Sequence, residues 1–330
     1  MKEVLETLRT QLEKFEVGAA RSSGGLTIFP LFGGLVGPSY LVAEQAFAEG
    51  TLLIEEIGSG EVPNISATNE AAAPVLLIDG EHLEGAKQSR IINISVLLPP
   101  RTKTVLPVSC VEQGRWSFDP ETHGTFRHSS DHAYGRLRRV QAEAVALAAT
   151  AGMERRASQD LVWSEIDSKM DEEDVASPTA GMFDLYGSRG PEMERFRSTF
   201  AAPEPEQTGA LVCIGGRPLA LDAFDKPATL ATMWNRLISG YAMDAGVVVE
   251  VEAEGHVAKG FLAQASAAGT AVHDGLGLGT DVGLRSAQVV GNALVWEQTV
   301  VHLALFARED AGGSRIARPS TRRARYDRRD

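Results

Sequence analysis

The chain has 330 residues, 43% of them hydrophobic and 23% charged, so it carries enough apolar material for a folded core. No apolar run is long enough to cross a bilayer, and the N-terminal residues lack the apolar segment of a signal peptide. Only two cysteines are present, Cys110 and Cys213, which argues against a disulfide framework and makes a reducing, cytoplasmic setting the expectation.

The charge of the chain is unevenly distributed. The formal net charge is −12, yet residues 315–330 contain seven arginines and two aspartates and are locally +5. The rest of the chain therefore carries about −17, and a body this acidic is a poor surface for nucleic acid. We expect residues 307–330 to form a disordered tail, which could contact phosphate or an acidic partner.

The N-terminal part of the chain is predicted to be a helix followed by strands. Apolar positions with helical spacing assign residues 1–19 to an amphipathic N-terminal helix. Strand-like runs then occupy residues 24–32, 51–57, 64–68, 75–78, 91–98 and 104–111, with a short helix at 39–49. Asp79-Gly80 is a strong hairpin signal, and turns link most of these runs, so we expect antiparallel pairing in a β-rich half over residues 20–118.

A helical middle is predicted over residues 119–200. Asp131 can cap a helix that runs to about residue 151, and Ser158 can cap the next one. Ser177-Pro178 marks the start of a third helix, to residue 186, and Pro191 opens a fourth, to residue 200. The polar, proline-bearing residues 201–208 are the best candidate for a boundary.

The last third of the chain, residues 209–306, returns to sheet. We expect a hairpin from runs 211–214 and 218–221, helices at 225–244 and 254–268, and a strand at 247–251. A long terminal hairpin is predicted from residues 284–290 and 294–306, turning at Gly291-Asn292. The fold class is therefore α+β, with antiparallel or mixed β-sheet halves flanking a central helical segment.

Residues 74–118 hold the strongest candidate for a functional site, because their polar side chains gather at strand ends and connections. Glu81, Glu84 and Glu112 could supply an acid and a base, for example at a glycosidic or N-glycosidic bond. Groups suited to a phosphate or carboxylate ligand accompany them: Lys87, Gln88, Arg90, Arg115 and Trp116. The alternative is a set of solvated turn residues.

Cys110 is a second candidate for catalysis. It could act as a nucleophile with His82 as its base, and Arg115 could lower its pKa. A thiol in a β-rich run is more often a small buried hydrophobe, and that alternative stays open. Cys213, in an apolar strand, is predicted to be structural.

Two further patterns fit metal and cofactor binding poorly. His123, His128 and His132 lie close together, but their spacing does not place two ligands on one helix face. The glycines of residues 275–279 lack the spacing of a dinucleotide-binding loop, and a strand is expected to follow them. A glycine turn is the better interpretation, and we expect neither a metal nor a cofactor.

Several segments together resemble a known bacterial and archaeal family. They are GEHLEGAKQSRIINISVLLPP (80–100), PVSCVEQGRW (107–116), VASPTAGMFDLY (175–186), GGRPLALDAFDKPAT (215–229) and VVHLALF (300–306). The chain is similar over residues 20–306 to the ARG and rhodanese-phosphatase-superfamily-associated protein domain. The resemblance implies a setting in ADP-ribose or nucleotide metabolism. It also implies a common site that consists of Glu81, Gly85, Lys87, Gln88, Arg90, Cys110, Glu112, Gly114, Arg115 and Trp116.

Two functions follow as hypotheses, and the sequence leaves open whether the protein is an enzyme. In the first, the glutamates and cations of residues 81–116 bind or hydrolyse a phosphorylated, nucleotide- or ADP-ribose-like ligand. In the second, the protein is a non-catalytic interaction or scaffold module with a protein partner, and the same polar cluster is structural. Removal of one partner from a buried ion pair would then cost about 3–5 kcal/mol of stability.

Overall fold

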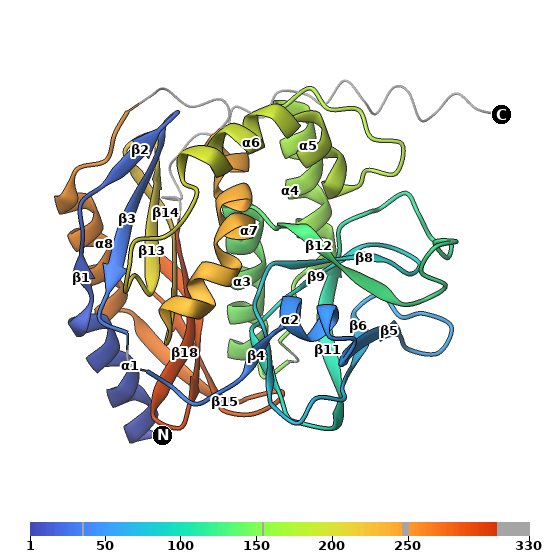
Figure 1. The fold of residues 1–330 in the computed structure, drawn as a ribbon, viewed down its shortest axis with the longest axis horizontal. Helices are drawn as coiled ribbons and strands as arrows, with labels where there is room; N and C mark the ends of the chain where they lie inside the picture. The colour runs from blue at the N-terminus through green and yellow to red at the C-terminus, as the bar shows by residue number, and fades with distance from the viewer. Residues whose placement is uncertain (35, 154, 246–250, 309–330) are drawn as a thin grey trace.

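A computed structural model of the chain describes residues 1–34, 36–153, 155–245 and 251–308 (Figure 1). Eight helices and eighteen strands lie within these ranges, which confirms the α+β class. Most of the expected strand at 247–251 and the predicted tail from residue 309 onward lie outside the described residues. Within them, no helix combines the length and apolar composition that crossing a membrane requires.

The largest sheet is built from both ends of the chain. Its order is β1-β3-β13-β14-β18-β17-β16-β15, with β2 also paired to β3, and all its pairs are antiparallel. The strands are β1 Glu16–Val17, β2 Arg21–Ser23, β3 Leu26–Phe32, β13 Gly209–Ile214, β14 Arg217–Phe224, β15 Gly269–Asp274, β16 Thr280–Arg285, β17 Val289–Trp296 and β18 Thr299–Ala307.

Helices cover both faces of this sheet, as Figure 1 shows. Alternate residues of a strand point to opposite faces, so Leu303 packs with α1 (Lys2–Lys14) and α8 (Gly255–Ser266). Its neighbour Ala304 belongs to the other core, which includes residues of α3 (Gly135–Thr150) and α7 (Pro227–Ala245). The remaining helices of the middle segment are α4 Gln159–Glu172, α5 Met182–Ser188 and α6 Gly190–Thr199.

A second, six-stranded sheet closes on itself. Its order is β12-β8-β9-β11-β6-β5, and an isolated bridge between Glu55 and Thr125 joins the last strand back to the start of the first. Leu83, Ile92 and Leu106 fill its apolar interior, so this unit is a small barrel. The strands are β5 Leu52–Glu56, β6 Asn64–Asn69, β8 Glu81–Gly85, β9 Arg90–Ile92, β11 Thr102–Cys110 and β12 Phe126–His132.

A third sheet has three strands, which come from the same part of the chain as the barrel strands. It consists of β4 (Leu41–Val42), β7 (Val75–Leu77) and β10 (Val96–Leu98), and helix α2 (Ala43–Ala48) follows β4 directly. The β4–β7 pair is parallel, whereas β10 and β7 are antiparallel.

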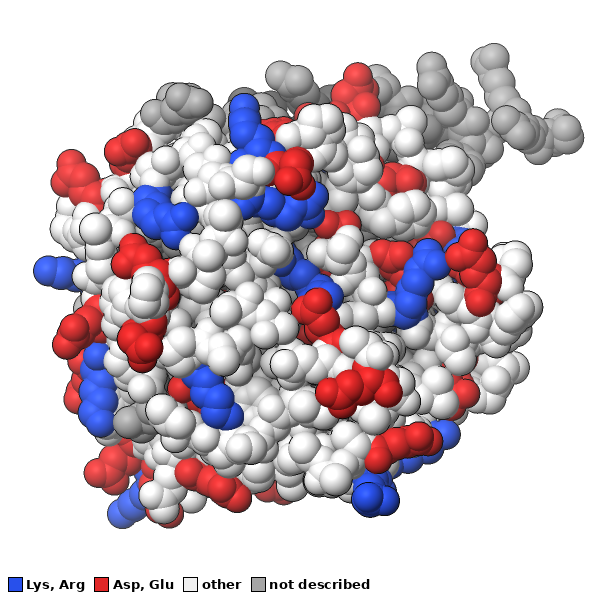
Figure 2. All heavy atoms as spheres, in the orientation of Figure 1, with Lys and Arg blue, Asp and Glu red and all other residues white. Residues whose placement is uncertain are grey.

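On the face shown in Figure 2, acidic and basic side chains are interspersed over the surface.

Several predicted boundaries in the first half of the chain are wrong. Residues 91–98 form two strands in different sheets, β9 and β10, and not one. Asp79-Gly80 therefore joins two sheets and makes no hairpin. Residues 126–132 form a strand because they pair with β8, so the helix expected from Asp131 begins only at Gly135. The helix expected from Ser177 begins at Met182.

The predicted terminal hairpin exists, formed by β17 and β18, but the predicted position of its turn is wrong. Gly291-Asn292 lies inside β17, and the turn falls at Glu297 and Gln298, which both have positive φ. A β-carbon on Gly291 would lie 2.0 Å from the carbonyl oxygen of Ala304, so this glycine permits close strand packing.

The glycine turn predicted over residues 275–279 is confirmed, and it joins β15 to β16. It also contacts the barrel side of the molecule, because the Leu278 amide donates to the Leu97 carbonyl over 2.8 Å. A β-carbon on Gly277 would lie 2.1 Å from that same carbonyl oxygen. The glycines therefore serve a close backbone approach between β10 and the β15–β16 turn.

Candidate functional site

Glu112 lies at the centre of a polar network just beyond β11. Its carboxylate accepts hydrogen bonds from Arg115 Nε (2.8 Å) and Nη2 (2.6 Å), and from the Ser89 amide and hydroxyl (both 3.1 Å). Burial acts to raise the pKa of Glu112, but the bonds from Arg115 and Ser89 outweigh it and hold the pKa below its usual value. Glu112 is therefore a paired, ionised carboxylate.

The other polar residues predicted to accompany Glu112 bond to the same network or to the backbone. Arg115 also donates to the carbonyls of Ala86 (2.8 Å) and Gly85 (3.1 Å). Gln88 donates to the Glu112 carbonyl (2.9 Å), and Arg90 donates to the Gln88 side chain (3.1 Å) and to Glu56 (3.4 Å). The structure thus brings Gln88, Arg90, Glu112 and Arg115 together, and they tie β9 to the segment after β11.

Lys87 and Trp116 lie at the surface beside this network. The Lys87 ammonium is 5.0 Å from the centre of the Trp116 ring and 4.9 Å from that of Phe118, and it also donates to the Ser59 carbonyl. Trp116 and Phe118 are about half exposed. These two rings are an apolar surface feature next to the buried polar network.

Cys110 is buried, and burial raises the pKa of its thiol to about 11. Its backbone forms two hydrogen bonds with the Gln159 side chain, 2.9 and 2.8 Å long. Among the hydrogen bonds of the described residues, none joins Cys110 to His82. A buried thiol with a raised pKa is a poor nucleophile, so the geometry favours the small-hydrophobe alternative.

Glu81 and Glu84 lie in β8 three residues apart and therefore point to opposite faces of the strand. Glu81 is fully buried, 3.6 Å from His128 Nε2, and neither of its oxygens has a hydrogen-bond partner among the described residues. Glu84 bonds to Ser129 and to Arg127 (3.2 Å). Glu81, Glu84 and Glu112 thus have different bonding partners, and the charges of both Glu84 and Glu112 act on the buried ring of His82.

His82 is buried beside Glu84, with its Nδ1 3.9 Å from the carboxylate. Burial lowers the pKa of His82 to about 4, so the ring is neutral near pH 7. Among the described residues, no three histidine, cysteine or acidic side chains are arranged to hold a metal ion.

The structure also shows a buried charge cluster that the sequence did not reveal. Arg138 of α3 donates to Asp222 of β14 and to Asp79, which follows β7. Ser95 bonds to Asp79 (3.1 Å) and to His302 Nδ1 (2.8 Å), and His302 Nε2 lies 3.3 Å from Asp222. This cluster joins the large sheet to the barrel side of the protein. Its members are far apart in the chain, so no local motif marks it.

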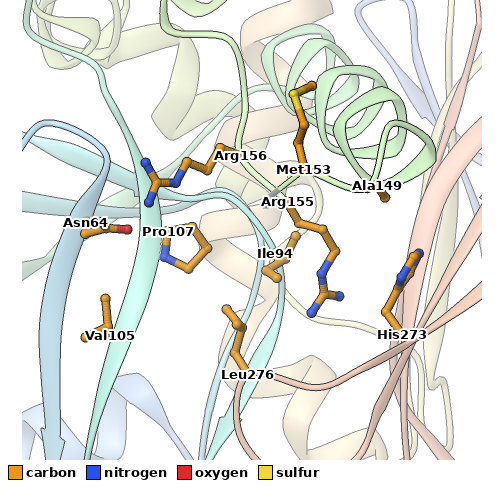
Figure 3. Close-up of a pocket in the computed structure, with 11 residues that line it drawn as sticks. Asn64, Ile94, Val105, Pro107, Ala149, Met153, Arg155, Arg156, His273 and Leu276 are labelled. Carbon is orange, nitrogen blue, oxygen red and sulfur yellow. The ribbon is translucent and has the colours of Figure 1, made fainter.

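A cleft lies where the barrel, the end of α3 and the β15–β16 hairpin meet (Figure 3). It has a volume of about 520 Å³. Its lining residues are Asn64, Ile94, Val105, Pro107, Ala149, Gly152, Met153, Arg155, Arg156, His273 and Leu276. Two adjacent arginines and a histidine thus share one cavity with several apolar side chains.

The polar groups of the cleft come from different elements. Arg155, in the segment after α3, donates to Asp281 of β16 (2.6 Å) and to the Asp274 carbonyl (2.7 Å). Arg156 points toward Asn64 (Figure 3), and its Nη2 lies 3.2 Å from the amide oxygen when the amide is turned to accept this bond. Burial and the nearby Arg155 lower the pKa of His273. The local sequence feature that could have indicated this cleft is the pair of adjacent arginines, Arg155 and Arg156, in a short segment after a helix.

The chain is thus an α+β protein in which a small closed barrel and a helix-covered antiparallel sheet share a cleft. It belongs to the family of the ARG and Rhodanese-Phosphatase-superfamily-associated Protein domain, whose family model matches residues 14–306. This match confirms the resemblance and leaves most of α1 outside the family domain. Neither the curated proteins nor the solved structures compared with the chain gave a match.

Proposed function

We propose that the protein binds a small phosphorylated ligand, nucleotide- or ADP-ribose-like, in the cleft of Figure 3. The observation that carries this proposal is the pair Arg155 and Arg156 in the wall of a cavity of about 520 Å³. Guanidinium groups suit phosphate oxygens because their donors form a planar fork. The cavity volume falls in the range of small-molecule sites.

The remaining lining residues favour a ligand with an apolar portion. Val105 and Met153 are more than half exposed in the described structure, and Leu276 lies near them in the cleft. A sugar or base would cover this apolar surface, and the gain grows with the area removed from water. The family name, which links the domain to ARG and phosphatase-superfamily proteins, supports testing phosphorylated compounds first.

Thermal-shift and calorimetric titrations of the full chain with ADP-ribose, NAD, mononucleotides and inorganic phosphate test this proposal. A ligand at 100 times its dissociation constant adds about 2.7 kcal/mol to the free energy of unfolding. Arg156→Ala should lose the shift, whereas Arg217→Ala, a surface arginine on β14, should keep it. The same mixtures are assayed for release of nicotinamide, AMP or phosphate, which tests hydrolysis. No shift with any compound, or an equal shift in Arg156→Ala, overturns the proposal.

The second candidate is a non-catalytic interaction module. This candidate is favoured because Gln88, Arg90, Glu112 and Arg115 form hydrogen bonds with one another. Such a network stabilises the fold and is not arranged for a ligand. The exposed Trp116 and Phe118 would then meet a protein partner. Co-purification with and without the change of both rings to serine tests this: the partner should be lost while the melting temperature is unchanged. A partner retained by the variant contradicts it.

A further inference from the structure

Asp281 is a buried acidic side chain that bonds to Arg155, a residue in the wall of the proposed ligand site. It lies in β16, is 6% exposed, and its carboxylate accepts a 2.6 Å hydrogen bond from Arg155 Nη1. Its neighbours across the sheet are His273 on β15 and Leu294 on β17. Arg155 therefore already holds an anion, and that anion comes from the protein itself.

The cost of burying the Asp281 carboxylate is only partly offset by its surroundings. Burial raises its pKa to about 6, and the attraction of Arg155 offsets only part of that effect. His273 is the cross-strand partner of Asp281 on β15, the Asp274 carbonyl accepts from Arg155, and Arg156 lines the same cleft as Arg155. The ionised form of the Asp281 carboxylate is therefore less stable at this position than in water.

Arg155 can exchange Asp281 for another anion without leaving its place. A guanidinium carries five N–H donors, and Arg155 uses one terminal nitrogen for Asp281 and the other for the Asp274 carbonyl. The bond to the Asp274 backbone anchors the arginine to the β15–β16 hairpin, independently of the Asp281 carboxylate.

We infer that Asp281 occupies, in the protein without ligand, the position at Arg155 that a phosphate or sulfate dianion takes when it binds. The inference rests on the proposed function, and it adds the charge class of the ligand and a built-in competitor at the site. When the dianion displaces Asp281, the released carboxylate sits beside a negative ligand and takes up a proton. Binding is therefore coupled to proton uptake.

Calorimetry with sulfate and with ADP-ribose at pH 7 compares wild type, Asp281→Asn and the control Asp274→Asn. Asp274 is exposed in the same hairpin, and its contact with Arg155 uses the backbone, which the substitution retains. Asp281→Asn should bind both anions roughly tenfold more tightly, since one charge-assisted competing bond is weakened. Asp274→Asn should bind like wild type.

Equal or weaker binding by Asp281→Asn overturns the inference while leaving the proposed function in place, because wild type still binds. If no form of the protein binds sulfate, ADP-ribose or phosphate, the proposed function fails and the inference fails with it. Binding by Asp281→Asn alone would show that the dianion does not displace Asp281 in wild type, and it overturns the inference.

A second measurement uses only variants that retain Asp281. Sulfate keeps its charge between pH 5.5 and 8, so titrations in buffers of different ionisation enthalpy report protons taken up by the protein. His273→Gln removes the histidine as a source of that signal. Proton uptake on sulfate binding should persist in His273→Gln, and its absence there overturns the inference.

Discussion

Arg138 and Asp222 form a two-point ion pair inside the protein, with Nη2–Oδ1 and Nη1–Oδ2 distances of 2.6 and 2.8 Å. Both side chains are at most 1% exposed. Asp79 accepts two further bonds from the same guanidinium, and Tyr241 donates to Asp222 over 2.5 Å. One arginine of α3 thus joins the large sheet, helix α7 and the connection into the barrel.

Loss of this arginine should destabilise the whole fold. In Arg138→Leu, Asp79 and Asp222 remain buried without their cation, and we expect a loss of about 3–5 kcal/mol in the free energy of unfolding. Urea denaturation measures it. Arg127→Ala, which removes the two ion pairs of a half-exposed arginine on β12, should cost less than about 1 kcal/mol. Equal losses of stability in the two variants would show that the buried cluster contributes no more to stability than an exposed arginine does.

The hydrogen-bond network around Glu112 should contribute to the stability of the fold and not to ligand binding in the cleft. Arg115→Ala removes the guanidinium bonds to the Glu112 carboxylate, which keeps those from Ser89, and to the carbonyls of Gly85 and Ala86, and we expect a loss of about 2–3 kcal/mol. Any ligand bound in the cleft should still shift the melting temperature. A variant with wild-type stability that no longer binds would instead place the ligand site in residues 81–116.

Both thiols should be inert in the native protein. Burial raises the pKa of Cys110 to about 11 and of Cys213 to about 12, so neither is a thiolate at pH 8. A disulfide reagent at pH 8 should label neither cysteine in the folded protein and both in urea. Rapid labelling of Cys110 in the folded protein would reopen its role as a nucleophile.

Asp281 should make stability depend on pH below neutrality. Its folded-state pKa, about 6, exceeds its usual value of 3.8, so the folded protein binds this proton more tightly than the unfolded chain does. The stabilisation is complete below about pH 4 and is lost as the pH rises through about 6, a change of about 3 kcal/mol. The free energy of unfolding is measured for wild type and Asp281→Asn at pH 4.5 and at pH 7. The stability of the variant relative to wild type should be greater at pH 7. A constant difference would contradict the raised pKa.

Two glycines of the large sheet should respond differently to alanine. In Gly291→Ala the new β-carbon would meet the Ala304 carbonyl at 2.0 Å, so strand β17 must move and we expect a loss of about 1–3 kcal/mol or more. On the neighbouring strand β16, the nearest atoms to a β-carbon on Gly283 are 3.7 Å away, and Gly283→Ala should change stability by about 0.5 kcal/mol or less. Thermal unfolding of both variants tests this, and similar losses would contradict the packing role of Gly291.

The sequence by itself determined the features that depend on neighbours in the chain. Helix α8 was predicted within a few residues because helical spacing and the glycine that follows it are local signals. The same holds for the β13–β14 hairpin, where a Gly-Gly turn separates two apolar runs. Glu112 and Arg115, three residues apart, were also recognised as one polar group. The family assignment rests on the same kind of information.

Only the tertiary structure decided which strands pair and what the polar groups do. Strand β12 forms because β8 lies beside it, and Gly291 lies within a strand because β17 pairs with β16 and β18. The Arg138–Asp222 pair and the cleft that joins Asn64 to His273 bring together residues far apart in sequence. A polar side chain binds whichever partner the fold places within hydrogen-bond distance. Whether that partner belongs to the protein or to a ligand therefore depends on long-range packing, which local sequence does not encode.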